Sequence, residues 1–306
     1  MEKDFHYFLT YAIVKLTGFD KPDVIAYSCQ FVDDNNEGQF SIDGKEVPFP
    51  EKLKVKGGSH YYPVMTQSLS PKSLDPFVQR YVYLPFHFLP GDNNVKINDA
   101  VNPISTTPNS NNIKQVLASA LASGNPYQVG IALHTMADTW SHQNFSGMQE
   151  EWNAVYPWYN VFKSFLPNIG HAEAGHSPDV ISEPWIDYRI GKTPISNKQR
   201  AYDAVREMYI ALQAHSRKGT PWQAVQSAFQ GIIDEDSYDE RIAAVSKLMG
   251  DTIPNYEKNT WIDAALDKDE EGAPVMKANF TNTDWYRFHQ AAKIQLAQVA
   301  DLTKAI

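Results

Sequence analysis

Residues 133–142 place two histidines and an aspartate at intervals of four residues. His134, Asp138 and His142 follow Asn125-Pro126, a pair that strongly signals the start of a helix. Side chains four residues apart on a helix project from one face, so these three should point the same way. Two imidazoles and a carboxylate can then bind a divalent metal, and Asp138 has two oxygens with which to bridge two ions. The alternative is a set of hydrogen-bonded core residues, but the joint occurrence of all three favours a metal site.

Other coordinating side chains lie on both sides of this helix. Asp33 and Asp34 end a predicted helix, where the dipole disfavours carboxylates unless a cation or water compensates. His60 follows two glycines and a serine, which allow a close approach of the backbone. His87 lies in an apolar frame and is equally compatible with a ligand, a substrate contact or a packed core residue. The remaining candidates, for which a purely structural role is the alternative, are Asp4, His6, His171 and His176.

Composition narrows the chemistry. The chain has 306 residues, of which 42% are hydrophobic and 21% are charged, as expected of a globular protein. A formal net charge of −9 argues against a general nucleic-acid coat. Because Cys29 is the single cysteine, a metal would have to be held by histidines and carboxylates. No leader pattern and no apolar run of about 20 residues is present, so we expect a soluble, cytoplasmic protein without a transmembrane segment.

Start and stop signals predict a mostly helical chain. We expect helices over 5–17, 22 to about 33, 112–123, 126 to about 145, 196–216, 221 onward, 239–249 and 283–306. A small β-hairpin is expected at 39–42 and 45–49 around Asp43-Gly44. Long loops rich in prolines and aromatic residues should fill most of the remainder. We predict a single domain over 1–306, with a metal-site portion at about 1–190 and a helical C-terminal portion at about 196–306. His215 and His289 lie on polar helices and are expected to be structural or solvent-facing.

The order of these ligands resembles the zinc-dependent phospholipase C and single-strand nuclease superfamily. The chain is still more similar to a bacterial family of uncharacterised proteins with the same layout, which shares segments at 4–7, 27–34, 133–147 and 170–178. In the superfamily, three zinc ions lie between helices, one carboxylate bridges two of them, and the cluster acts on a phosphoester. The resemblance implies three sets of ligands here: Asp33 or Asp34 with His60, His134 and Asp138; His142 with His171 and His176; and His6 with Asp4.

Two departures from the superfamily pattern bear on the ligand set. The superfamily uses a free N-terminal tryptophan amine as a ligand, whereas this chain starts at Met1. We therefore expect that contact to be absent and Asp4 to replace it. The later ligands of the superfamily read H-x-x-x-E, whereas His171 and His176 stand here. These differences leave the number of metals and the substrate open.

The predicted function is that of a metal-dependent hydrolase of small-molecule or lipid phosphoesters. Two or three zinc ions would activate water, with manganese, iron or nickel as alternatives, and the non-ligating member of Asp33 and Asp34 would orient that water. His87, Tyr61 and Trp140 are the candidates to contact the substrate. The alternatives are a hydrolase of amide or ester bonds on the same metals, and a non-catalytic metal-binding or partner-binding helical protein. The sequence does not indicate an oligomeric state.

Overall fold

The computed structural model describes residues 1–36, 53–55, 60–91, 96–97, 99–156, 167–250, 253–270 and 274–304. The protein is mostly α-helical, as predicted. Among the described residues, no helix is both long enough and apolar enough to cross a membrane. The hairpin expected at 39–49 lies outside the described residues.

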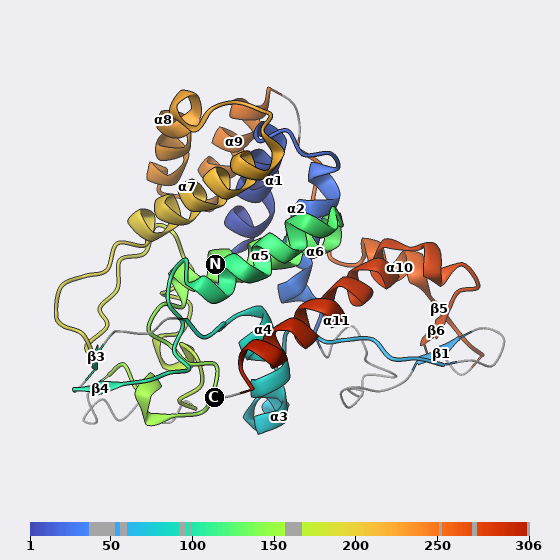
Figure 1. Ribbon diagram of the computed structural model, residues 1–306, viewed down its shortest axis with the longest axis horizontal. Helices are drawn as coiled ribbons and strands as arrows, with labels where there is room; N and C mark the ends of the chain where they lie inside the picture. Colours follow the sequence, from blue (N-terminus) through green and yellow to red (C-terminus); the bar gives the residue numbers. More distant parts are fainter. Residues whose placement is uncertain are drawn as a thin grey trace.

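Helix α6 (Pro126–Ser141) forms the centre of the fold, and all but two of its residues are buried. It packs against α2 (Pro22–Asp34), α5 (Asn111–Ser123), α7 (Asn197–Ser216) and α11 (Asp284–Leu302), as Figure 1 shows. Asn125 caps α6 by accepting hydrogen bonds from Tyr127 and Gln128 N–H, and Pro126 follows at its first position. The start of the helix is thus where the sequence predicts it.

The C-terminal end of α6 differs from the prediction. The helix ends at Ser141 and not near residue 145, with His142 as its C-cap. The backbone turns at Asn144, whose φ of 70° lies in the left-handed region, which asparagine tolerates better than most residues. His142 therefore stands on a cap, still beside Asp138, where its side chain can turn away from the helix.

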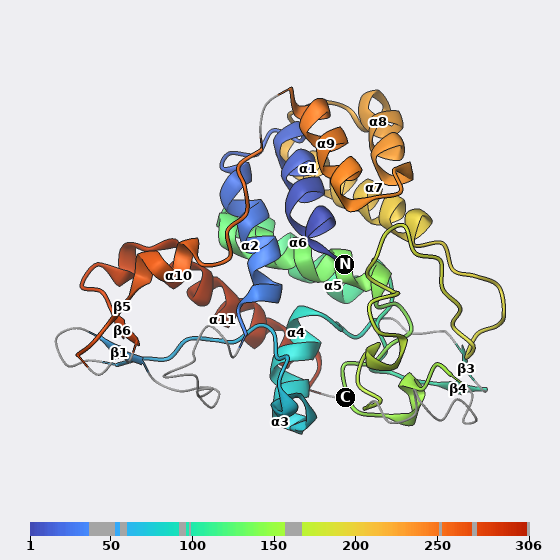
Figure 2. The ribbon, with the colours of Figure 1, turned by 180° about the vertical axis from the view of Figure 1, so that it is seen from behind.

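The N-terminal segment lies against the helices of the C-terminal half. A π-helix, η1 (Asp4–Leu9), continues into α1 (Thr10–Leu16), and together they contact α2, α7 and α9 (Tyr238–Met249). Helix α8 (Trp222–Asp234) joins α7 to α9. Figure 2 shows these helices as one group, with the N-terminus at its lower edge, close to α6. The first residues of the chain are thereby held next to the end of α6.

A chain of short elements leads from α2 to α5. These are η3 (Pro71–Leu74), α3 (Pro76–Val78), η4 (Gln79–Tyr83) and α4 (Leu84–Phe86). Helix α4 packs on α6 and α11, and this contact brings the following residue, His87, to the middle of α6. Further 3-10 helices occur later in the chain. They are η5 (Glu151–Asn153), η6 (Ala172–Ala174) and η7 (Phe280–Asn282).

The strands are short and peripheral. A four-stranded sheet has the order β2 (His60–Tyr61), β1 (Leu53–Val55), β6 (Pro274–Met276) and β5 (Leu266–Lys268). Strands β1 and β6 pair in parallel, with Val55 opposite Met276, and the other pairs are antiparallel. Strands β3 (Lys96–Ile97) and β4 (Ala100–Val101) form a separate antiparallel pair. Helix α10 (Thr260–Ala265) leads into β5.

Candidate metal centre

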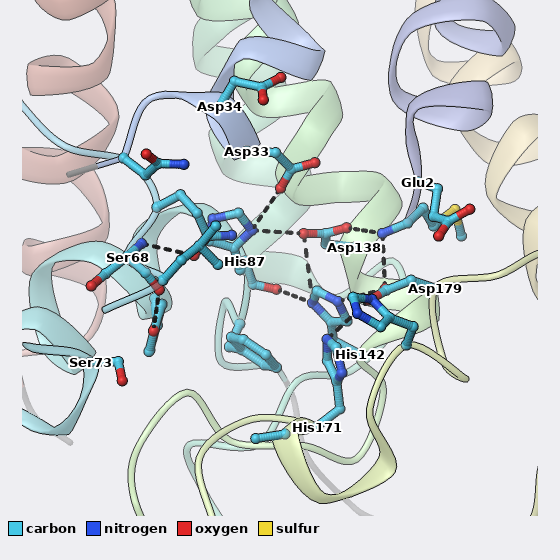
Figure 3. Close-up of a pocket in the computed structure, with 18 of the residues that line it drawn as sticks. Glu2, Asp33, Asp34, Ser68, Ser73, His87, Asp138, His142, His171 and Asp179 are labelled. Carbon is cyan, nitrogen blue, oxygen red and sulfur yellow. Dashed lines mark hydrogen bonds and ion pairs between the residues drawn. The ribbon is translucent and has the colours of Figure 1, made fainter. Parts of the chain in front are cut away.

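Asp138 lies at the centre of a buried group of histidines and aspartates. Its side chain is 1% exposed, and both of its carboxylate oxygens face nitrogen atoms. The surrounding groups come from the chain terminus, α2, the residue after α4, α6 itself and the segment around η6 (Figure 3). They are the Met1 amino group, His6, Asp33, His87, His134, His142, His171 and Asp179.

Backbone carbonyls determine which ring nitrogens carry protons. His134 Nδ1 lies 2.8 Å from the Cys29 carbonyl oxygen, and His87 Nε2 lies 2.8 Å from the Thr66 carbonyl oxygen. Because a carbonyl can only accept a hydrogen bond, both of these nitrogens donate. In the neutral rings, His134 Nε2 and His87 Nδ1 are consequently left with lone pairs. Such outer contacts are the usual way in which proteins orient histidines for a metal.

The two lone pairs face each other and two carboxylates. His87 Nδ1 and His134 Nε2 are 3.2 Å apart, and Asp138 Oδ2 lies 3.1 Å and 3.2 Å from them. Asp33 Oδ1 closes the group at 3.8 Å and 3.6 Å from the same nitrogens. In a tetrahedral zinc site with bonds near 2.05 Å, neighbouring donor atoms lie roughly 3.3 Å apart. The two nitrogens and Asp138 Oδ2 have nearly that spacing, and Asp33 Oδ1 lies somewhat farther from both nitrogens.

A second group lies beside the first. His142 Nε2 is 3.0 Å from Asp179 Oδ1, and His171 Nε2 is 3.2 Å from Asp179 Oδ2. The other nitrogen of each ring faces a carbonyl oxygen, that of His87 at 2.9 Å and that of Gly175 at 2.8 Å. His142 Nδ1 also lies 3.6 Å from Asp138 Oδ2, which links the two groups. Two imidazole nitrogens and one carboxylate therefore point at a common place.

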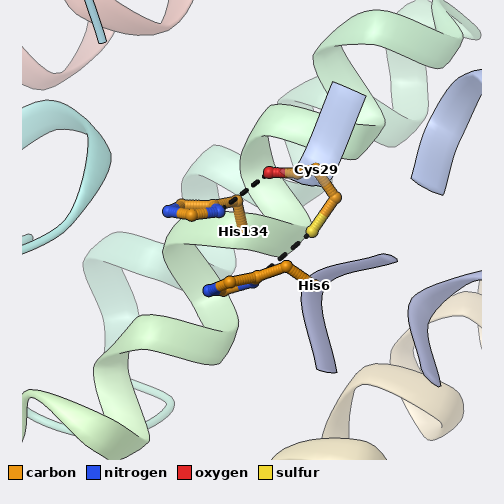
Figure 4. Close-up of side chains that lie close together, drawn as sticks. All are labelled: His6, Cys29 and His134. Carbon is orange, nitrogen blue, oxygen red and sulfur yellow. Dashed lines mark hydrogen bonds between the residues drawn. The ribbon is translucent and has the colours of Figure 1, made fainter. Parts of the chain in front are cut away.

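The N-terminal segment supplies the third side of the centre. The Met1 amino group lies 2.8 Å from Asp138 Oδ1 and 3.1 Å from Asp179 Oδ1. His6 Nε2 is 3.1 Å from Asp138 Oδ1, and its ring stacks on His134 with centroids 4.0 Å apart. Figure 4 shows His6 Nδ1 facing the Cys29 thiol at 3.7 Å, while the carbonyl of the same cysteine faces His134. One residue of α2 thus contacts two of the site histidines.

The protonation states follow from burial and neighbouring charge. Burial raises the pKa of Asp138, but His142 and the Met1 ammonium outweigh it and hold the value well below the usual range. The same ammonium and both neighbouring histidines hold the pKa of Asp179 well below its usual range, against burial. Burial raises the pKa of Asp33 to about 7. Burial would lower the pKa of the Met1 amine, yet Asp138 and Asp179 raise it to about 11. The centre thus holds two carboxylates of lowered pKa, a third carboxyl group whose pKa is about 7, and the Met1 ammonium.

Burial and neighbouring charge also shift the pKa values of three of the site histidines. Burial, and then the neighbouring His134, hold the pKa of His6 well below its usual range. Burial also lowers the pKa of His171. For His142, Asp138 and Asp179 outweigh burial and raise the pKa. His6 and His171 are therefore neutral rings, with lone pairs available to a cation.

A pocket of about 750 Å³ opens onto the centre. Asp33 is 28% exposed there, whereas the side chain of Asp138 behind it is 1% exposed. His87, His142 and His171 also line the pocket. The Phe88 ring stacks on His142 with centroids 4.5 Å apart and forms part of the apolar wall. Small molecules can therefore reach these donor atoms from the pocket.

The chain belongs to a family of unknown function, DUF6765. The family profile matches residues 1–302, and so covers both the centre and the C-terminal helices. No curated protein and no solved structure matches the chain. Since the description of DUF6765 assigns no activity, the resemblance to the phospholipase C and nuclease superfamily stays a prediction. The function must be argued from the site.

Several of the predicted site residues are not brought to this centre of the DUF6765 chain. Asp4 Oδ2 pairs with Arg241 Nε at 2.6 Å, and both side chains are buried, so Asp4 does not replace an N-terminal amine. The amino group of Met1 itself stands there, contrary to the prediction. Asp34 accepts hydrogen bonds from Tyr256 Oη at 2.8 Å and Gln30 Nε2 at 3.2 Å instead of facing the histidines.

The remaining corrections concern one histidine and the aromatic candidates. His176 lines the pocket mouth but is exposed, and the carboxylate of Asp179 holds the place predicted for it. The backbone of His60 lies in β2, and its side chain is outside the described residues. Tyr61 packs against Phe280, Trp285 and Tyr286, and Trp140 is buried in the main core, so neither lines the pocket.

Two groups at the centre were not predicted, and one was predicted in another role. Asp179 follows His176 by three residues, and a search for carboxylates near histidines would have found it. The Met1 amine has no sequence signal of its own. His87, predicted as a substrate contact, lies among the metal-type donors because α4 packs on α6.

Proposed function

We propose that this protein is a metal-dependent hydrolase of phosphoesters, with two or three ions held by the histidines and aspartates around Asp138. One observation carries the proposal. His87 Nδ1 and His134 Nε2 are 3.2 Å apart, and each has its proton on the opposite side of the ring. Two lone pairs at that distance repel each other unless a proton or a cation lies between them. A metal ion satisfies both nitrogens and the two adjacent carboxylates together.

The charge of the centre supports more than one ion. Asp33, Asp138 and Asp179 bring three carboxylates into a buried volume, where the Met1 ammonium is the neighbouring cation. Unbalanced buried charge is expensive, so further positive charge would stabilise the arrangement. The imidazole donors also separate into groups: His87 with His134, His142 with His171, and His6 beside the Met1 amine, which would bind an ion only after losing a proton. Asp138 contacts all three groups and is the natural bridging ligand.

Zinc matches the donor set best. The donors are imidazole nitrogens and carboxylate oxygens with nearly tetrahedral spacing, which is typical of zinc sites. Manganese, iron and nickel accept the same donors and remain testable alternatives. When bound, such ions supply Lewis-acid polarisation of a phosphoryl oxygen and a water of lowered pKa.

The pocket favours an enzyme over a structural metal site, because structural zinc sites are closed by four protein ligands. Here Asp33, His142 and His171 are reached from a pocket of about 750 Å³, which is the size of a small-molecule site. Asp33 is the most exposed carboxylate of the first group and is placed to hold a proton of an attacking water. The carbonyls behind the histidines orient the imidazole donors.

Adjacent ion sites with a shared carboxylate suit phosphoryl transfer. In an in-line displacement the attacking and leaving oxygens both develop charge, and neighbouring cations stabilise both. Ester or amide hydrolysis on the same ions is the competing activity.

The test is a panel of substrates on metal-loaded protein. The panel compares three phosphoesters with two other substrates. The phosphoesters are nitrophenyl phosphate, bis-nitrophenyl phosphate and single-stranded DNA, and the others are nitrophenyl acetate and a peptide amide. We expect chelator-sensitive turnover of a phosphoester that is lost in Asp138→Asn and kept in His215→Ala, an exposed histidine far from the centre in the sequence. Turnover confined to the acetate or the amide would reassign the reaction. If the metal-loaded protein turned over none of these substrates, the result would favour a non-catalytic metal-binding role.

A further inference from the structure

Two lysines that line the pocket lack an ion pair with any acid in the part of the chain that the structure describes. Lys3 and Lys258 are the only lysine or arginine side chains among the described residues that line it. Neither forms an ion pair in the described part of the chain. Elsewhere, Lys198 and Lys304 do pair with acids, at 2.6 Å and 2.7 Å. The charges of the two pocket lysines are therefore available to a ligand.

The segment that carries Lys258 is fastened in place. Residues 253–258 have no regular structure and run along α2 between α9 and α10 (Figure 2). Three tyrosine hydroxyls tie this segment to η1 and α2. Their hydrogen bonds are Tyr7 Oη to the Pro254 carbonyl at 2.8 Å, Tyr27 Oη to the Glu257 carbonyl at 2.7 Å, and Tyr256 Oη to Asp34 Oδ2 at 2.8 Å. These three partly buried hydrogen bonds hold the irregular segment, and with it the backbone of Lys258, beside the pocket.

Lys3 is also placed by an aromatic contact and not by an acid. Its Nζ lies 5.9 Å from the centroid of the Tyr238 ring, and Tyr238 lines the same pocket from α9. Such a contact orients a lysine while leaving its charge unneutralised. Both lysines thus bring their amino groups to the pocket without an ion pair among the described residues.

The acids at the mouth do not cancel these charges. Glu2 and Asp34 line the pocket outside the metal-type groups. Asp34 is already hydrogen-bonded by Tyr256 and Gln30, whereas Glu2 has no hydrogen bond or ion pair from its side chain to another described residue. Another part of the lining is apolar and consists of Phe88, Pro167, Ile169 and Ala172.

We propose that the pocket selects phosphoesters that carry a second negative charge away from the reacting phosphorus, and that Lys258, assisted by Lys3, determines this specificity. The proposal rests on the hydrolase function proposed above. It places the reacting phosphoryl group at the histidine and aspartate centre and the distal anion at the lysines. A substrate whose distal group is a quaternary ammonium would be disfavoured by the same charges.

Three nitrophenyl phosphodiesters test this charge selectivity. All three share the same scissile bond and the same nitrophenyl leaving group. Their second ester group is ethyl, choline or carboxypropyl, so the distal group is neutral, positively charged or negatively charged. Partly exposed ion pairs give about two- to fivefold effects. We expect kcat/KM to rank carboxypropyl above ethyl above choline, each step about two- to fivefold at low salt and shrinking at about 0.5 M salt.

Variants assign the effect to the lysine. Lys258→Met keeps the length of the side chain and should bring the carboxypropyl-to-ethyl ratio close to one, and Lys258→Glu should invert it. Lys114→Met, an exposed lysine on α5, is the matched control and should leave the ratio unchanged. Turnover of all three esters at equal kcat/KM, unaltered in Lys258→Glu, would overturn the specificity and leave the hydrolase function standing. No turnover of any of the three by metal-loaded protein would count against the hydrolase function itself.

Discussion

Gly130 sets the distance between α2 and α6, and replacing it tests whether the centre depends on that distance. A Cβ at this position would lie 2.3 Å from the Ile25 carbonyl oxygen and 2.5 Å from the Ser28 Cβ. Both neighbours belong to α2, which carries Asp33 and the Cys29 carbonyl. Ordinary contact lies near 3.5 Å, so Gly130→Ala must push the helices apart by roughly 1 Å. Metal sites tolerate deviations of about 0.2 Å, and the displaced carboxylate should no longer fit.

We expect Gly130→Ala to lower stability by about 1–3 kcal/mol through overpacking, and to weaken metal binding by about tenfold or more. The assays are chemical unfolding of the metal-free protein and metal titration against a competing chelator. Gly231→Ala on α8 is the matched control, because a Cβ there meets nothing within 4 Å. It should be neutral or stabilising, since alanine favours helices over glycine. If Gly130→Ala bound metal as tightly as Gly231→Ala, the helix spacing would not position the site.

Three further outcomes follow from the structure. Asp33→Asn should lower the metal content, whereas Asp34→Asn should keep it, because Asp34 faces Tyr256; elemental analysis of both variants decides. Chelation should lower the melting temperature, and added zinc should restore it, because metal binding and folding are linked. Burial lowers the pKa of His289 to about 3, so the unfolded chain binds its proton first and stability falls as pH drops from about 6.5 toward 3. Urea unfolding of wild type and His289→Gln should show that their difference in stability changes by about 2 kcal/mol between about pH 7 and pH 5; a constant difference would contradict this.

Local patterns in the sequence predict the central helix and its ligands. The spacing of His134, Asp138 and His142 and the cap at Asn125 depend on neighbouring residues alone, and the structure places them as expected up to the C-cap. The positions of Asp33 and His6 also agree with the prediction that they lie near this helix.

The rest depends on contacts between distant segments. The sequence predicts Asp4 as a ligand, but in the structure its carboxylate pairs with Arg241, which is 237 residues away. His289 lies on a polar helix but is fully buried beside Trp285, and its Nδ1 accepts from the Val64 N–H at 3.1 Å. It is therefore not solvent-facing, and its replacement by alanine is expected to destabilise the fold. Neither outcome can be predicted from periodicity, because the partner is on another element.

Metal content of protein purified without a histidine tag tests the central claim most directly. Elemental analysis should find about two to three equivalents of divalent metal per chain after zinc is supplied and excess removed. His87→Ala should lose about one equivalent while circular dichroism shows an intact helical fold. Less than about one equivalent in the wild type, unchanged by added zinc or manganese, would contradict the account, because the paired lone pairs of His87 and His134 would then have to be explained without a metal.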